Sequence, residues 1–195
     1  MSFWSRVRQF LLKTSRPLTS LIGKIHLPYT RKRITSRDYR ALTAILKPGM
    51  GLVTRTNGEF SNLFIPGHAS HAGNYCHDRM VVEATGKGVV HTDLLDFAMT
   101  KDEIWVIRPR AATEEEMCAA ADWTEKQIGD PYDLTFDPHN EAFYCSELFY
   151  QSYTKTMGAE KLGWEIPETW GMPTVVPQDL LDSPGVFECV LKLPL

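Results

Sequence analysis

The segment from residue 51 to residue 108 carries a series of short apolar runs that are separated by turn-forming residues. Strands are predicted over residues 51–55, 70–75, 79–84, 87–92 and 103–108, and a last one over residues 187–193. The close spacing of the central runs indicates antiparallel pairing. We therefore expect an antiparallel sheet of four to six strands.

Segments with helical periodicity surround these strands. Helices are predicted over residues 36–46, 114–128 and 145–157, with short helical turns over residues 93–97 and 178–181. Thr35 or Ser36 is placed to cap the first helix, whereas Thr113 and Glu116 form a capping-box pair before the second, which Gly129 ends. Residues 163–177 are expected to cover the core. The sequence predicts an α+β fold in one domain.

The charge of the chain is unevenly distributed. Residues 1–40 carry ten basic side chains and one acidic side chain, a net charge of +9, so the remaining residues carry −12 of the overall −3. Residues 3–13 also place apolar side chains on one side of a helical wheel. We therefore predict a basic amphipathic arm at residues 1–33 and a separate domain at residues 34–195. The arm either packs on its own domain or contacts an anionic membrane or a partner protein.

Cysteine usage and hydropathy bear on the cellular compartment. The four cysteines are irregularly spaced without a C-x-x-C pair, so neither a disulfide framework nor a zinc ribbon is expected. No apolar run has the length of a membrane span, and residues 10–12 are too short for the apolar core of a signal peptide. We expect a cytoplasmic protein with membrane association as an alternative. No nucleic-acid-binding motif accompanies the basic residues, so no nucleic acid partner is expected.

Cys145 stands where a segment rich in turn formers, residues 129–140, gives way to a predicted helix. Unpaired backbone N–H groups and the positive end of the helix dipole favour a thiolate in the first helical turn, and the same N–H groups can stabilise an oxyanion. Such a thiolate can attack acyl groups. The alternative is that Cys145 packs as a small buried apolar residue, as most free cysteines do.

A histidine and a carboxylate are available upstream of Cys145. Residues 67–75 contain His68 and His71 among small residues, and Glu83 lies near the end of the next apolar run. Small residues beside His71 would let a substrate and the Cys145 turn come close, whereas His68 lies in the preceding loop. Glu83 either orients an imidazole or is simply exposed on a strand.

Four short motifs occur in a characteristic order: residues 70–73, 82–84, 131–133 and 144–148. Residues 48–190 resemble the circularly permuted papain-like amidases of the YiiX/YaeF group, which are related to the NlpC-type peptidases and, more distantly, to lecithin:retinol acyltransferase. The resemblance implies a permuted papain-like fold in which Cys145 is the nucleophile, His71 its base and Glu83 the group that orients the imidazole. It implies a cysteine peptidase or amidase that cleaves an amide, ester or thioester bond through an acyl-enzyme.

The resemblance leaves the substrate and the reaction partner open. We expect the substrate site to be lined by Tyr132, Asp133, Ser70 and Tyr144. The substrate is a small molecule, a peptide or a lipid, and a lipid-directed acyltransferase and a non-catalytic binding module remain alternatives.

No cofactor is expected, because the chain has no nucleotide-binding loop or dinucleotide fingerprint. A metal site built on His68, His71, Cys76 and His77 is disfavoured, since zinc ligands at this spacing normally lie on a helix or tight loop with a clear third ligand. His77, His91 and His139 are expected to be solvated.

Overall fold

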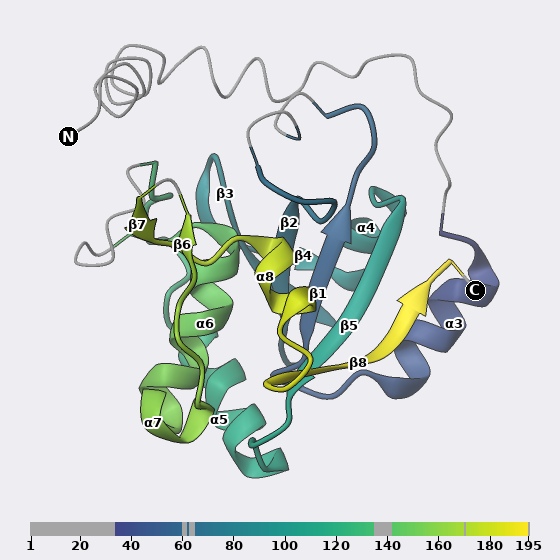
Figure 1. Cartoon of the computed structure of the whole chain (residues 1–195). Helices are drawn as coiled ribbons and strands as arrows, with labels where there is room; N and C mark the ends of the chain where they lie inside the picture. Colours follow the sequence, from purple (N-terminus) through teal and green to yellow (C-terminus); the bar gives the residue numbers. More distant parts are fainter. Residues whose placement is uncertain (1–33, 60–61, 63–64, 135–141, 170, 195) are drawn as a thin grey trace.

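A six-stranded antiparallel sheet lies at the centre of the molecule in the computed structural model (Figure 1). The strands are β1 (Gly51–Arg55), β2 (His71–Tyr75), β3 (Met80–Thr85), β4 (Gly88–Asp93), β5 (Glu103–Pro109) and β8 (Phe187–Leu193). Their order across the sheet is β4-β3-β2-β1-β5-β8. The antiparallel sheet is confirmed, at the upper end of the predicted size.

The structure describes residues 34–59, 62, 65–134, 142–169 and 171–194. The predicted basic arm at residues 1–33 and His139 lie outside the described residues, so these predictions are untested. None of the described helices is both long enough and apolar enough to cross a membrane.

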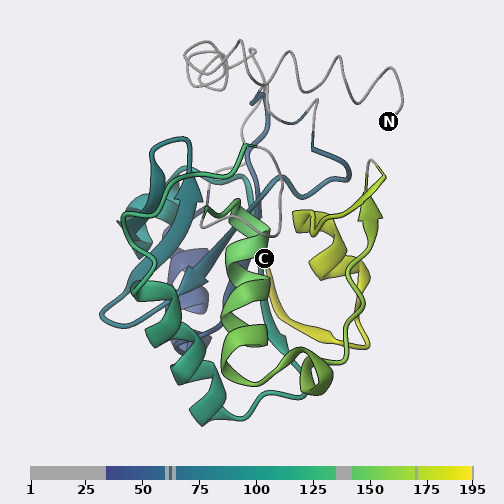
Figure 2. The same cartoon turned by 90° about the vertical axis from the view of Figure 1, so that its left-hand side faces the viewer.

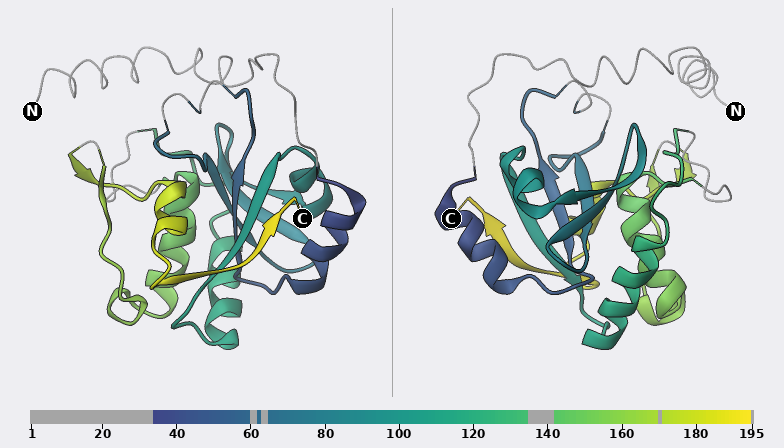
Figure 3. Two further views of the ribbon diagram at one scale, coloured as in Figure 1. Left: turned by 45° about the vertical axis from the view of Figure 1, so that its right-hand side comes forward. Right: turned by 180° about the vertical axis from the view of Figure 1, so that it is seen from behind.

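Helices cover both faces of the sheet, as Figure 3 shows. One face packs against α5 (Glu114–Glu125), α6 (Cys145–Thr156) and α8 (Pro177–Asp182), and the other against α3 (Ser36–Ile45) and α4 (Leu94–Met99). Residues alternate between the faces along each strand: in β1, Leu52 points to the α3 and α4 side and Val53 to the opposite side. α5 and α6 run side by side (Figure 2).

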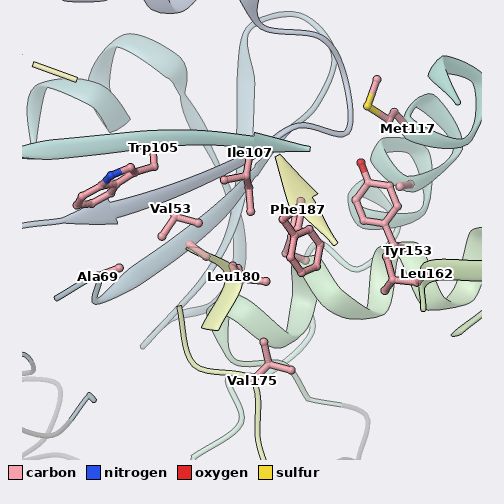
Figure 4. Packing of buried hydrophobic residues seen from close by; sticks show 13 residues of the cluster. Val53, Ala69, Trp105, Ile107, Met117, Tyr153, Leu162, Val175, Leu180 and Phe187 are labelled. Atoms are coloured by element: carbon pink, nitrogen blue, oxygen red, sulfur yellow. The ribbon is translucent and has the colours of Figure 1, made fainter. Parts of the chain in front are cut away.

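The larger apolar cluster lies between the sheet and the α5–α6–α8 layer (Figure 4). Val53, Trp105 and Ile107 of the sheet meet Tyr153 of α6 and Leu180 of α8 there. The segment after α6 contributes Trp164, Ile166 and Val175 to the same cluster, so parts of the predicted covering segment pack on the core. This segment also contains a two-stranded sheet, β6 (Glu168–Thr169) and β7 (Met172–Pro173).

Several helices differ from the prediction in their ends, and one helix was not predicted. α5 ends at Glu125, and the next residues form turns in which Gln127 and Ile128 donate to carbonyls three residues back. A short helix that was not predicted, α7 (Ala159–Leu162), begins directly after Gly158, whose positive φ of 87° ends α6 and redirects the chain. α8 is one residue longer at each end than the predicted turn; it begins at Pro177, which is well suited to the first helical position.

Gly49 connects α3 and β1 to the helices of the opposite layer. Its φ is +89°, and a Cβ atom there would lie 2.2 Å from the carbonyl oxygen of Met117, so only glycine fits. The hydroxyl of the fully buried Tyr153 donates to the carbonyl oxygen of Gly49 at 2.6 Å. This bond links α6 to the turn that leads into β1.

Removing the Tyr153 hydroxyl should therefore destabilise the fold. We expect Tyr153→Phe to lower the free energy of unfolding by about 1–3 kcal/mol, because it removes a partner from a buried carbonyl. Urea denaturation measures this change. Tyr150→Phe is the matched control on the same helix, since the half-buried Tyr150 hydroxyl makes no hydrogen bond to the described residues. Equal losses of stability in the two variants would show that the bond from Tyr153 to Gly49 does not stabilise the fold.

Candidate active site

Three elements bring Cys145, His71 and Glu83 together. Cys145 is the first residue of α6 and is only 5% exposed. His71 is the first residue of β2, where it pairs with Thr54 of β1, and Glu83 lies on β3, the next strand in the sheet. The α6 helix packs on β2 and β3, so its N-terminus comes to the strand end that carries His71.

The carboxylate of Glu83 orients the imidazole of His71 and is itself held by Thr92. His71 Nε2 donates to Glu83 Oε2 at 2.6 Å, and the hydroxyl of Thr92 on β4 donates to Glu83 Oε1 at 2.7 Å. The burial of Glu83 raises its pKa, but the hydrogen bond and charge of His71 outweigh this effect and lower the pKa to about 2. Glu83 is therefore ionised at neutral pH, and the proton on Nε2 leaves Nδ1 for another partner.

That partner is the thiol of Cys145, with which His71 shares a hydrogen bond. Burial raises the pKa of Cys145, but the charge and the hydrogen bond of His71 lower it. The backbone of Ala72 and the side chain of Ser146 lower it further, so the net pKa lies below the ordinary value of 9.0. Burial lowers the pKa of His71, but interactions with Cys145 and Glu83 raise it to about 9. The two shifts together favour a thiolate–imidazolium pair at neutral pH.

Two residues of this site were not among the predicted site residues. Thr92 lies diagonally across the β3–β4 hairpin from Glu83, because Thr92 is paired with Val81, two residues before Glu83 on β3. A correct hairpin register would have indicated it. Lys101 lies over the ring of Phe97, with 4.6 Å between its Nζ and the ring centroid, and Phe97 packs against the imidazole of His71. The charge of Lys101 lowers the pKa of both His71 and Glu83.

The start of α6 is anchored to the segment that follows β7. The hydroxyl of Tyr144 accepts a bond from the backbone N–H of Val175 at 3.0 Å, and the hydroxyl of Ser146 donates to the Val175 carbonyl at 2.7 Å. These bonds hold the residues on both sides of Cys145. Tyr144 thus has a structural task besides its predicted place in the substrate site.

The other predicted substrate-site residues lie near the same point. Tyr132 forms a bridge with Phe143, and the N–H of the buried Asp133 donates to the Phe143 carbonyl at 3.0 Å. Burial first, and then the nearby charge of Cys145, raise the pKa of Tyr132, so its phenol stays protonated and can donate a hydrogen bond. Ser70 precedes His71; its hydroxyl is buried without a partner among the described residues.

His68 is engaged elsewhere. Its Nε2 lies 2.8 Å from Glu103 Oε1 on β5, and its ring packs edge-on against Trp105. His68 and His71 therefore bind different carboxylates, and the structure brings His71 to Cys145. Of the remaining histidines, His91 is exposed, as predicted, while His77 is half-buried and bound to Asp122.

Comparisons with known proteins identify the family and the fold of the chain. Residues 46–190 match the model of a family described as permuted papain-like amidase enzyme, YaeF/YiiX, C92 family. The chain is similar to the crystal structure of the metalloprotein yiiX from Escherichia coli O157:H7, with a TM-score of 0.56 and 20% sequence identity over 76% of this chain and 96% of the other. No curated protein matches the sequence. The chain belongs to the YaeF/YiiX family of permuted papain-like amidases, which are cysteine peptidases, and it is a cysteine hydrolase.

Proposed function

We propose that the protein cleaves an amide, ester or thioester bond through an acyl-enzyme on Cys145. The observation that carries this proposal is the hydrogen-bonded row of Cys145, His71, Glu83 and Thr92, in which each group orients the previous one. A thiolate held beside an imidazolium is a ready nucleophile with its proton donor in place.

The first half-reaction uses both members of the pair. The Cys145 sulfur attacks the substrate carbonyl carbon, a C–S bond forms, and the carbonyl oxygen takes up the negative charge. The N–H of Cys145 at the start of α6 and the protonated phenol of Tyr132 are the donors that we assign to this oxyanion. The bond to the leaving group then breaks, and the leaving group takes the proton of His71.

In the second half-reaction His71 works as a base. Neutral His71 takes a proton from water while the water oxygen attacks the thioester. The C–S bond breaks, the product acid leaves, and the thiolate–imidazolium pair is restored. We assign to Glu83 and Thr92 the task of keeping Nδ1 directed at the sulfur, and to Ser70, Tyr132, Asp133 and Tyr144 the walls of the substrate site.

Transfer of the acyl group to a lipid-borne acceptor is the second candidate. The basic amphipathic sequence of residues 1–33 favours it, because such segments bind anionic membrane surfaces. We propose that these residues hold the protein peripherally on an anionic bilayer. Binding of the full chain to phosphatidylserine vesicles, but not to phosphatidylcholine vesicles, is the expected result in a sedimentation assay; equal binding would contradict this role.

The covalent step can be tested directly. Purified full-length protein is mixed with p-nitrophenyl acetate or an acyl thioester, quenched in acid and analysed by intact mass and peptide mapping. We expect one acyl group on Cys145, and none on that peptide in Cys145→Ser. Acid as the sole product in the presence of excess amine or lipid acceptor favours hydrolysis over transfer, and the absence of any adduct and turnover would favour a binding module.

A further inference from the structure

A group of three side chains that could hold a metal ion lies in the turn after β2 and on α5. His77 Nε2 is 2.8 Å from Asp122 Oδ1, and the backbone N–H of His77 donates to Glu125 Oε1 at 3.4 Å. One ligand atom from each side chain lies within 4.8 Å of the other two. Three donors that share a metal ion at ordinary zinc–ligand distances of about 2.0–2.2 Å are separated by spacings of this size or less.

Two separate elements hold these three side chains. His77 begins the tight turn between β2 and β3, which is closed by bonds from Met80 N to the His77 carbonyl and from Cys76 N to the Met80 carbonyl. Asp122 and Glu125 are three residues apart on α5 and therefore lie on one face of that helix. The ligand geometry is thus set by the packing of the hairpin turn on α5.

We propose that His77, Asp122 and Glu125 form a binding site for a divalent transition-metal ion of the zinc class. Two carboxylates and a neutral imidazole carry a charge of −2, which one divalent cation neutralises. The imidazole favours zinc and its neighbours in the transition series over calcium and magnesium, which prefer oxygen ligands only. The side chains of His77 and Asp122 are 41% and 59% exposed, so an ion can reach them.

Metal binding replaces the hydrogen bond between His77 and Asp122 with three bonds from protein ligands to the ion. The metal takes the Nε2 lone pair of His77, so the hydrogen bond between Nε2 and Asp122 is lost and the imidazole keeps its proton on Nδ1. One oxygen of each carboxylate completes the protein ligands, and water fills the remaining positions. The neighbouring Cys76 is turned inward, with its sulfur directed at the carbonyls of Asn74 and Ala121, and is not included in the site.

A metal ion at this site would stabilise the fold and take no part in the reaction at Cys145. His71 begins β2 and His77 lies two residues beyond the other end of that strand, so six residues, a length of up to about 20 Å of extended chain, separate them. A metal ion at His77 ties the β2–β3 turn to α5, and this hairpin carries His71 and Glu83. Metal binding at His77 therefore does not depend on the chemistry proposed for Cys145.

Metal retention by the full chain tests the site. Protein stripped with chelator is incubated with zinc, dialysed and analysed for bound metal by mass spectrometry, and its thermal unfolding is followed with and without zinc. We expect one zinc ion per chain and an increase in Tm of about 5–10 °C when free zinc is a hundred times Kd. His77→Gln and Asp122→Asn should each lose both effects.

His91→Gln is the matched control, because His91 is exposed on β4 and outside the site. It should retain the ion and the Tm increase. Three results would each overturn the proposal: equal zinc binding by wild type and His77→Gln, no zinc retained by wild type, or loss of zinc only on Cys145→Ser. The last result would place the ion at the Cys145 thiol.

Discussion

Replacing Cys145 by alanine should reduce kcat/KM for an acyl substrate by on the order of 10⁴-fold, because the variant has no group that can form the thioester. The fold should be retained, since Cys145 begins a helix whose start is also held by the hydrogen bonds that Tyr144 accepts from Val175 and that Ser146 donates to it. Steady-state kinetics on the purified full chain measure the loss, and circular dichroism checks the fold.

A second cysteine provides the control for this change. Cys118 is exposed on α5, so Cys118→Ala should keep kcat/KM within about twofold of wild type. A Cys145→Ala variant that retains activity within tenfold of wild type would remove Cys145 from the reaction.

Replacing Glu83 by glutamine should lower kcat by about 10²- to 10⁴-fold without preventing the fold, because the neutral amide orients His71 less well and does not stabilise its charge. The change also has a signature in the pH profile. The hydrogen bond of Glu83 is one of the interactions that raise the pKa of His71 to about 9, so its loss lowers that pKa. The alkaline limb of the kcat/KM profile, which reports the free enzyme, should therefore move from about pH 9 toward lower pH.

Thr92→Val offers a graded comparison. It removes the hydrogen bond to Glu83 Oε1 but keeps the carboxylate and its bond to His71, so the alkaline limb should move in the same direction by a smaller amount. A Glu83→Gln profile that is superimposable on the wild-type profile would show that this carboxylate does not act on the imidazole.

Much of the fold follows from local sequence patterns. The capping pairs Thr35 with Asp38 and Thr113 with Glu116 are both formed, and they fix the starts of α3 and α5. The strands of the sheet also lie within a residue or two of the predicted ranges, since apolar alternation and turn formers are local signals. The order of the six strands depends on long-range pairing instead, which no local pattern determines.

The candidate site was predictable where one residue type had a clear context, and less so where partners come from distant segments. Cys145 at a helix start and a histidine on a strand were both indicated by the sequence. The choice between His68 and His71 as the partner of Cys145 depends on which carboxylate each ring reaches, Glu103 or Glu83. Lys101 lies close to the site because α4 packs beside the sheet, and the sequence does not reveal this packing.

The pH dependence of Cys145 alkylation tests the central claim most directly. Peptide mapping follows the rate of iodoacetamide reaction at Cys145 from pH 4 to pH 11 in the wild type and in His71→Ala. The wild-type rate should rise with an inflection below the ordinary thiol value of 9.0, because the charge and the hydrogen bond of His71 outweigh burial and lower the pKa of Cys145.

In His71→Ala the imidazolium is absent and burial is left to raise the pKa of Cys145, so the thiol should react appreciably only above about pH 9. This separation of the two profiles is the result predicted for a thiolate–imidazolium pair. Two superimposable profiles, both with the inflection of an ordinary thiol, would contradict it.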